Sequence, residues 1–135
     1  MVKILTGKKG SGKTKKLIEL ATAALRNSNG NVVVVETGSQ MTYDIPMQAR
    51  LVDASDYGVK GAPMALGFFS GLCAGNYDIT DILVDGTLRL VEMADLADFV
   101  ANLNKLSEES NTTIVLSVSA DPDELPEAVK AAALQ

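Results

Sequence analysis

Residues 7–14 read Gly-Lys-Lys-Gly-Ser-Gly-Lys-Thr, and they fit the pattern G-x-x-x-x-G-K-[ST] at every required position. Glycine adopts backbone angles that other residues avoid, so this loop can wrap around a phosphate and point successive N–H groups at it. The apolar run 2–6 before the loop predicts a buried strand, and the apolar spacing after Gly12 predicts a helix. Such a helix presents its positive N-terminal end to the same anion. The stretch therefore predicts a strand, a phosphate-binding loop and a helix in succession.

Further strands and helices follow from the hydrophobic pattern. Three apolar runs predict strands at residues 32–35, 82–84 and 113–118. These runs lack polar alternation, so both faces of each strand are expected to be buried, as in a parallel sheet between helix layers. Apolar residues at helical spacing predict helices in the segments 62–74, 85–113 and 123–134.

The segment 38–61 has the least regular pattern. It is expected to hold a short hairpin or an irregular loop, with 41–45 and 50–52 as candidate extended pieces. In the last predicted helix, Asp123 is the expected N-cap and Pro126 falls near the first turn. Strands that alternate with helices over 135 residues predict a single domain, residues 1–135. The expected fold class is α/β, a three-layer α/β/α arrangement with a mostly parallel sheet of four or five strands.

Composition excludes several kinds of site. The chain has no histidine and one cysteine, Cys73, which rules out a Ser-His-Asp or Cys-His centre, an imidazole metal site and an internal disulfide. A formal net charge of −5 argues against bulk binding to nucleic acid or to an anionic membrane. The apolar runs are shorter than the roughly 20 residues that a membrane span needs, and a free thiol suits a reducing compartment. A cytoplasmic protein is therefore expected.

Positive charge is concentrated at one end of the chain. Half of the 12 basic residues fall within the first sixteen positions, as Lys3, Lys8, Lys9, Lys13, Lys15 and Lys16. Such a cluster in an acidic protein indicates either a local anion site or a solvated basic corner, and charge alone does not separate the two.

With residues 7–14 as a Walker A loop, the chain resembles the P-loop NTPases. Residues 82–85, an apolar strand that ends in Asp85, look like the Walker B segment of that superfamily. The whole chain is also similar to small, uncharacterised bacterial P-loop ATP-binding proteins. The resemblance implies Mg²⁺ and a purine nucleotide, ATP or else GTP. Lys13 would reach the β- and γ-phosphates and serve catalysis, while Thr14 and Asp85 would hold the Mg²⁺. The implied nucleotide-binding residues are Gly7, Lys8, Lys9, Gly10, Ser11, Gly12, Lys13 and Thr14.

The chain departs from related ATPases after Asp85. Many of them place a glutamate there as the base for the attacking water, whereas this chain has Gly86. Glu36 is either a replacement base or a solvated strand-end charge.

Ser117 and Ser119 either sense the γ-phosphate or bond to nearby backbone. They also favour insertion of the strand at 113–118 between those at 2–6 and 82–84, against a place outside the first strand. Arg50 is either a charge-neutralising finger, in cis or from a neighbouring subunit, or an ordinary surface residue.

These features predict a Mg²⁺-dependent purine nucleotide-binding protein with slow or partner-activated hydrolysis. A slow switch of this kind is read by a protein partner, and an oligomer is compatible with it. One alternative is a non-catalytic assembly module that holds a nucleotide. Another is a small-molecule phosphotransferase, although segment 38–80 is short for an acceptor pocket and lid. A nucleic-acid-dependent ATPase fits the acidic charge poorly.

Overall fold

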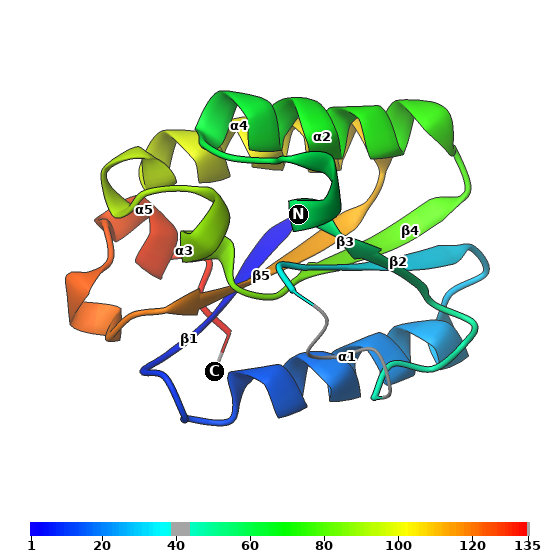
Figure 1. Cartoon of the computed structure of the whole chain (residues 1–135), viewed down its shortest axis with the longest axis horizontal. Helices are drawn as coiled ribbons and strands as arrows, with labels where there is room; N and C mark the ends of the chain where they lie inside the picture. Colours follow the sequence, from blue (N-terminus) through cyan, green and yellow to red (C-terminus); the bar gives the residue numbers. More distant parts are fainter. Residues whose placement is uncertain (39–43, 135) are drawn as a thin grey trace.

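Among the residues that the structure describes, the sheet is parallel and has five strands. The computed structural model describes residues 1–38 and 44–134. Within them, the strand order is β1-β5-β4-β2-β3 (Figure 1). The strands are β1 (Val2–Gly7), β2 (Asn31–Glu36), β3 (Arg50–Asp53), β4 (Ile79–Val84) and β5 (Thr113–Ser119). All four strands predicted from apolar runs are confirmed, and the candidate extended piece 50–52 is β3. The insertion of β5 between β1 and β4 is also confirmed.

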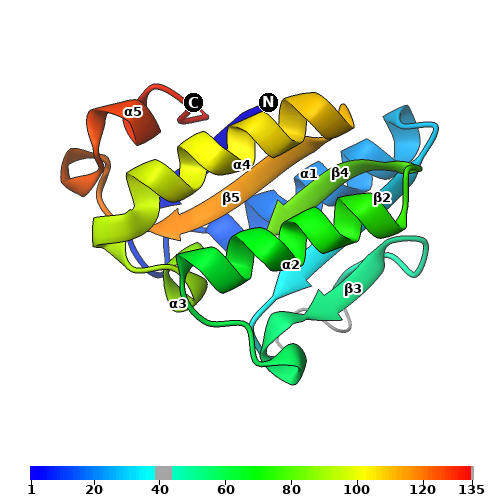
Figure 2. The ribbon, with the colours of Figure 1, turned by 90° about the horizontal axis from the view of Figure 1, so that it is seen from above.

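Helices cover both faces of the sheet, because its strands are apolar on both sides. Figures 1 and 2 show α1 (Lys13–Asn27) on one face, and α2 (Ala62–Gly75) with α4 (Leu96–Ser110) on the other. In β2, Val32 and Val34 belong to the hydrophobic cluster under α1, whereas Val33 and Val35 belong to the cluster under α2 and α4. The predicted three-layer α/β/α fold is therefore confirmed. Among the described residues, no helix combines the length and apolar character needed to span a membrane.

Two predicted helices differ from the observed ones. The segment 85–113 was expected to be one long helix, but it divides into α3 (Thr87–Leu90), a 3₁₀ turn η2 (Met93–Asp95) and α4. Gly86 precedes α3 with a φ of 71°, a left-handed backbone that turns the chain sharply after β4. The amphipathic pattern was real, but it belongs to α4 alone.

The helix predicted at 123–134 is wrong over most of its length. The chain forms a 3₁₀ turn, η3 (Pro122–Glu124), and one short helix, α5 (Glu127–Lys130). Asp121 caps η3 in place of the expected Asp123, by accepting a hydrogen bond from the Asp123 N–H at 3.1 Å. Beyond α5 the backbone pairs with the edge of β1: the Ile4 N–H donates to the Ala132 carbonyl at 2.8 Å, and the Leu134 N–H donates to the Ile4 carbonyl at 2.7 Å. These long-range bonds compete with a helix for the same backbone groups.

The segment before β3 is only partly described. Of the candidate extended piece 41–45, residues 41–43 lie outside the described residues, while Asp44 and Ile45 lie in a turn. After β3, a 3₁₀ turn η1 (Ala54–Tyr57) leads towards α2. The predicted helix at 62–74 is confirmed as α2.

Gly30, in the turn between α1 and β2, is enclosed by backbone. A Cβ at this position would lie 2.2 Å from the Asp78 carbonyl oxygen and 2.4 Å from the Thr80 Cγ2. The Asp78 carbonyl cannot move away without weakening the 2.7 Å hydrogen bond that it accepts from the Asn31 N–H. We expect Gly30→Ala to lower the free energy of unfolding by about 1–3 kcal/mol in urea titrations. Gly67→Ala, in the open middle of α2, should instead raise it by up to about 1 kcal/mol. Equal stability of Gly30→Ala and wild type would contradict the clash.

Candidate nucleotide-binding site

The loop between β1 and α1 has the backbone that its glycines predict. Gly12 has a φ of 89° and directly precedes the first residue of α1, so the helix begins immediately after a left-handed turn. Gly7 lies where a side chain would collide, since a Cβ there would be 2.3 Å from the Ser11 Oγ. The Ser11 N–H donates to the Lys8 carbonyl at 3.0 Å and folds the loop back on itself. The loop N–H groups and the N-terminus of α1 therefore lie at the carboxyl end of β1.

Lys13 is buried at the base of this loop. Its side chain belongs to a residue only 8% exposed, and its Nζ donates to the Lys8 carbonyl at 2.9 Å. Burial lowers the pKa of Lys13 by desolvating the ammonium group, and the negative charge of Asp85 opposes that decrease. A buried ammonium beside loop amides is a strong partner for an anion, because little water competes with it.

Asp85 connects the loop to the centre of the sheet. Its Oδ1 accepts a hydrogen bond from the Ser117 Oγ at 3.0 Å, and the Thr14 Oγ1 lies 3.5 Å away as a second donor. The Ser117 Oγ in turn accepts a bond from the Gly86 N–H at 3.1 Å. Because β5 lies between β1 and β4, Ser117 is positioned to hold the Asp85 carboxylate towards Thr14. The two residues predicted to hold a metal are thus brought together.

The donor set fits Mg²⁺. A hydroxyl and a carboxylate are oxygen ligands, and Mg²⁺ in nucleotide sites is commonly held by one or two protein groups, with phosphates and water completing its octahedron. Within residues 1–38 and 44–134, no cluster of three or more acidic, histidine or cysteine side chains could hold a metal. Thr14 and Asp85 are the oxygen groups of this site that could hold such an ion.

A cavity of about 360 Å³ lies above these groups and contains a residue that sequence reasoning missed. Arg89, on α3, lines it together with the loop. The Arg89 Nη1 donates to the carbonyl and to the Oγ1 of Thr37, each at 3.3 Å. The sequence could have indicated this residue, because Arg89 follows the end of β4 by only a few residues and ligands bind at the carboxyl ends of parallel strands. The lining comprises Lys9, Gly10, Gly12, Lys13, Thr14, Asp85, Gly86, Arg89 and Ser119.

The other predicted candidates are distributed differently. Ser119 lines the cavity, whereas Ser117 is buried and bonded to Asp85. Glu36 is buried at the carboxyl end of β2 and lies outside the cavity lining. Arg50 is the first residue of β3, at the opposite end of the parallel sheet from the loop, and this position disfavours the alternative of a finger in cis. Lys8 is exposed and forms an ion pair with Asp121 at 3.8 Å.

Comparisons with known proteins give a likeness of fold. No family model matches the chain, and no curated protein matches it. Among solved structures, the chain is similar to domain III from the Thermotoga maritima replication initiation protein DnaA, with a TM-score of 0.53 and 16% sequence identity. The match covers 96% of this chain and 50% of that chain, so this chain spans half the length of that structure. With the parallel sheet and its two helix layers, the likeness establishes a P-loop NTPase-like α/β/α fold.

Proposed function

We propose that residues 1–135 form one P-loop nucleotide-binding domain, which binds ATP together with Mg²⁺. The observation that carries the proposal is the meeting of three groups in one cavity: the buried ammonium of Lys13, the Thr14–Asp85 pair and the amides of the loop. The first is a cation for a phosphate, the second an oxygen set for Mg²⁺, and the third a row of donors for phosphate oxygens. An ordinary glycine-rich turn needs none of these features.

Each group has a defined task in this proposal. The N–H groups of residues 7–14 and the N-terminus of α1 bind the phosphates, and Lys13 lies against the β- and γ-phosphates. Thr14 and Asp85 would hold a Mg²⁺ ion, which would supply positive charge to the phosphate oxygens. Ser117 is a positioning residue, because it fixes the carboxylate of Asp85.

Hydrolysis in the isolated protein is proposed to be slow. Among the residues described, Asp85 is the one carboxylate in the cavity lining, and it is engaged with Thr14 and Ser117. A carboxylate held in this way is a poor base for an attacking water. A partner protein that supplies or repositions a base would then accelerate turnover, which suits a switch.

Arg89 is proposed to neutralise charge at the terminal phosphate in cis, because its guanidinium lies in the same cavity as Lys13. We expect Arg89→Ala to weaken ATP binding about tenfold or more, the effect of one lost charged hydrogen bond, while ADP binding changes less. Titration calorimetry with both nucleotides measures this difference. Arg26→Ala, in α1 and outside the cavity, is the matched control. An equal loss of ATP and ADP affinity would place Arg89 away from the terminal phosphate.

Thermal melting with ATP, GTP or no nucleotide, each with and without Mg²⁺, tests the proposal. Nucleotide at a hundred times its dissociation constant should stabilise the fold by about 2.7 kcal/mol, which raises the melting temperature by several degrees. The shift should require Mg²⁺, and the nucleotide that gives the larger shift identifies the preferred base. Absence of any shift in a folded sample would refute ATP binding. Phosphate release, lost in Lys13→Ala, separates hydrolysis from purely structural nucleotide binding.

A further inference from the structure

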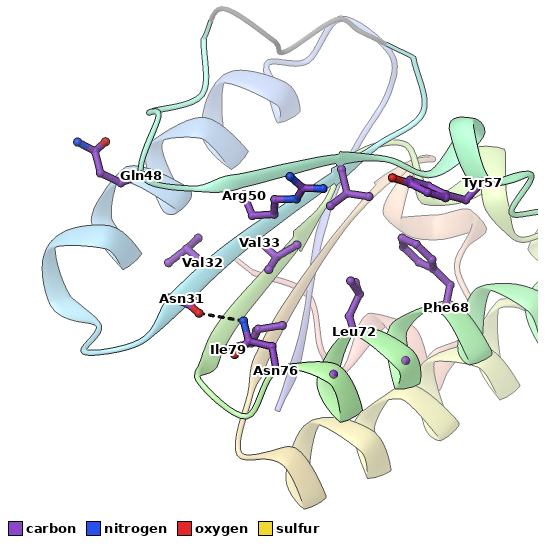
Figure 3. Close-up of a pocket in the computed structure, with 13 residues that line it drawn as sticks. Asn31, Val32, Val33, Gln48, Arg50, Tyr57, Phe68, Leu72, Asn76 and Ile79 are labelled. Carbon is purple, nitrogen blue, oxygen red and sulfur yellow. Dashed lines mark hydrogen bonds between the residues drawn. The ribbon is translucent and has the colours of Figure 1, made fainter.

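A second hollow, larger than the cavity at the loop, lies away from the nucleotide site. It is a groove of about 660 Å³ between α2 and the strands β2 and β3 (Figure 3). Asn31, Arg50 and Ile79, which line it, are the first residues of β2, β3 and β4. The groove therefore begins at the amino ends of these strands and extends to Tyr57, which follows β3, whereas the phosphate loop follows the carboxyl end of β1. The two cavities share no lining residue.

The walls of the groove are apolar, and two glycines widen it. Val33 and Val52 line the sheet side, while Phe68 and Leu72 project from α2 (Figure 3). Gly71 and Gly75 lie one helical turn apart on the same wall, and a Cβ added at either would meet no atom within 4 Å. Glycine within a helix is less stable than alanine, and here it leaves apolar space open to solvent. The missing side chains at these two positions leave additional space on the helix wall of the groove.

Polar groups are restricted to the two ends and to one rim. At one end the Asn76 Nδ2 donates a hydrogen bond to the Asn31 Oδ1 at 2.9 Å, and at the other the rings of Tyr57 and Phe68 lie near each other (Figure 3). The middle of the groove is therefore apolar, which suits the apolar body of a small molecule.

Arg50 is the one charged side chain among the lining residues. Figure 3 shows its guanidinium directed along the groove towards Tyr57. It is exposed, and among the residues that the structure describes it has no ion-pair partner. An exposed guanidinium at the rim of an apolar groove is complementary to an anion that carries an apolar body, because it can bond a carboxylate through two parallel N–H groups.

We propose that this groove binds a small amphipathic anion, a molecule with an apolar body and one carboxylate or similar group. The apolar body lies against Val33, Val52 and Leu72, and the anionic group lies at Arg50. The volume falls within the roughly 300–1,000 Å³ range of small-molecule sites, which are mostly apolar with a few polar groups that fix orientation. The site is separate from the proposed nucleotide site and does not depend on it.

Decanoate and decanol, which differ in charge but share the apolar chain, are the probes. We expect decanoate, added below its micellar concentration, to shift the ¹H–¹⁵N NMR signals of groove residues such as Gly71 and Asn76. Its affinity should exceed that of decanol about tenfold or more, the effect of one charged hydrogen bond. Equal affinities, or decanoate shifts spread over the whole surface, would overturn the proposal. Groove shifts that depend on protein concentration without any ligand would overturn it in favour of a second copy of the chain.

Matched variants localise the binding. Gly71→Leu fills the groove and should abolish decanoate binding, whereas Gly67→Leu places the same side chain on the same helix outside the lining and should not. Arg50→Gln should reduce decanoate affinity to that of decanol, and Arg26→Gln should leave it unchanged. Since Arg50 is exposed, its variant keeps the test valid even if Gly71→Leu disturbs folding. Decanoate binding that survives both groove variants would refute the site, whatever the outcome of the nucleotide experiments.

Discussion

Lys13→Ala will weaken binding of Mg²⁺–ATP by about a hundredfold to a thousandfold. Truncating one partner of a buried, hydrogen-bonded charge pair costs about 2–5 kcal/mol, and each 1.4 kcal/mol is a factor of ten in affinity. Lys13 meets the condition of burial, since it is 8% exposed and donates to the loop carbonyl of Lys8. Titration calorimetry at fixed Mg²⁺ measures the difference.

The same variant should fold as well as wild type. Burial lowers the pKa of Lys13, so the folded state carries a desolvation penalty for this ammonium that alanine removes. A loss of ATP binding can therefore be assigned to the lost cation and not to unfolding. Lys16→Ala removes one exposed positive charge from the same helix and should change affinity little. Full ATP affinity in Lys13→Ala would exclude this loop as the phosphate site.

Phe69→Ala will lower the free energy of unfolding by about 3–5 kcal/mol, the largest stability effect expected from one side chain in this molecule. Phe69 is fully buried in the hydrophobic cluster between the sheet and α2 and α4. Its ring lies edge-on to Phe68, with centroids 5.4 Å apart, and 6.3 Å from the ring of Phe99 on α4. Alanine loses the transfer free energy of the ring and leaves a cavity that rigid strands cannot fill.

Urea unfolding monitored by circular dichroism measures this loss. Tyr77→Ala is the matched control, because Tyr77 is an aromatic residue that is 93% exposed, and its removal should change stability by less than about 0.5 kcal/mol. A decrease for Phe69→Ala comparable to that control would mean that α2 contributes little to the core.

Local patterns account for the parts of the fold that the sequence predicts correctly. The run 32–35 was assigned to a strand buried on both faces, and its valines do alternate between the two hydrophobic clusters. The insertion of β5 followed from the serines at its end, and Ser117 indeed lies against Asp85. These features depend on residues close together in sequence, or on a motif whose spacing fixes a geometry.

Some features were predicted incorrectly or missed because contacts with residues distant in sequence determine them. Residues 131–134 have the composition of a helix, yet backbone hydrogen bonds to Ile4 hold this segment against the edge of β1. The pattern of these residues alone does not predict that pairing. Arg89 was missed although it closely follows β4, and its hydrogen bonds to Thr37, which follows β2 and is distant in sequence, are not indicated by the local pattern. The groove beside Arg50 arises from the packing of α2 over only part of the sheet, which periodicity does not specify.

The order of the strands also determines when their pairings can form during synthesis of the chain. The pairing of Val2 with Ile114 and of Gly7 with Ser119 joins β1 to β5, the last strand among the described residues, and β5 is also the neighbour of β4. Until β5 is synthesised, the edges of β1 and β4 that face it have unpaired backbone N–H and C=O groups. Such edges can pair with strands of other chains. Because β5 lies between β1 and β4, its pairing with β1 joins residues that are distant in sequence, and long-range pairing of this kind slows folding. Because Ser117 belongs to β5, the hydrogen bond that holds the Asp85 carboxylate requires β5 to be paired in the sheet, so the candidate site depends on this long-range pairing.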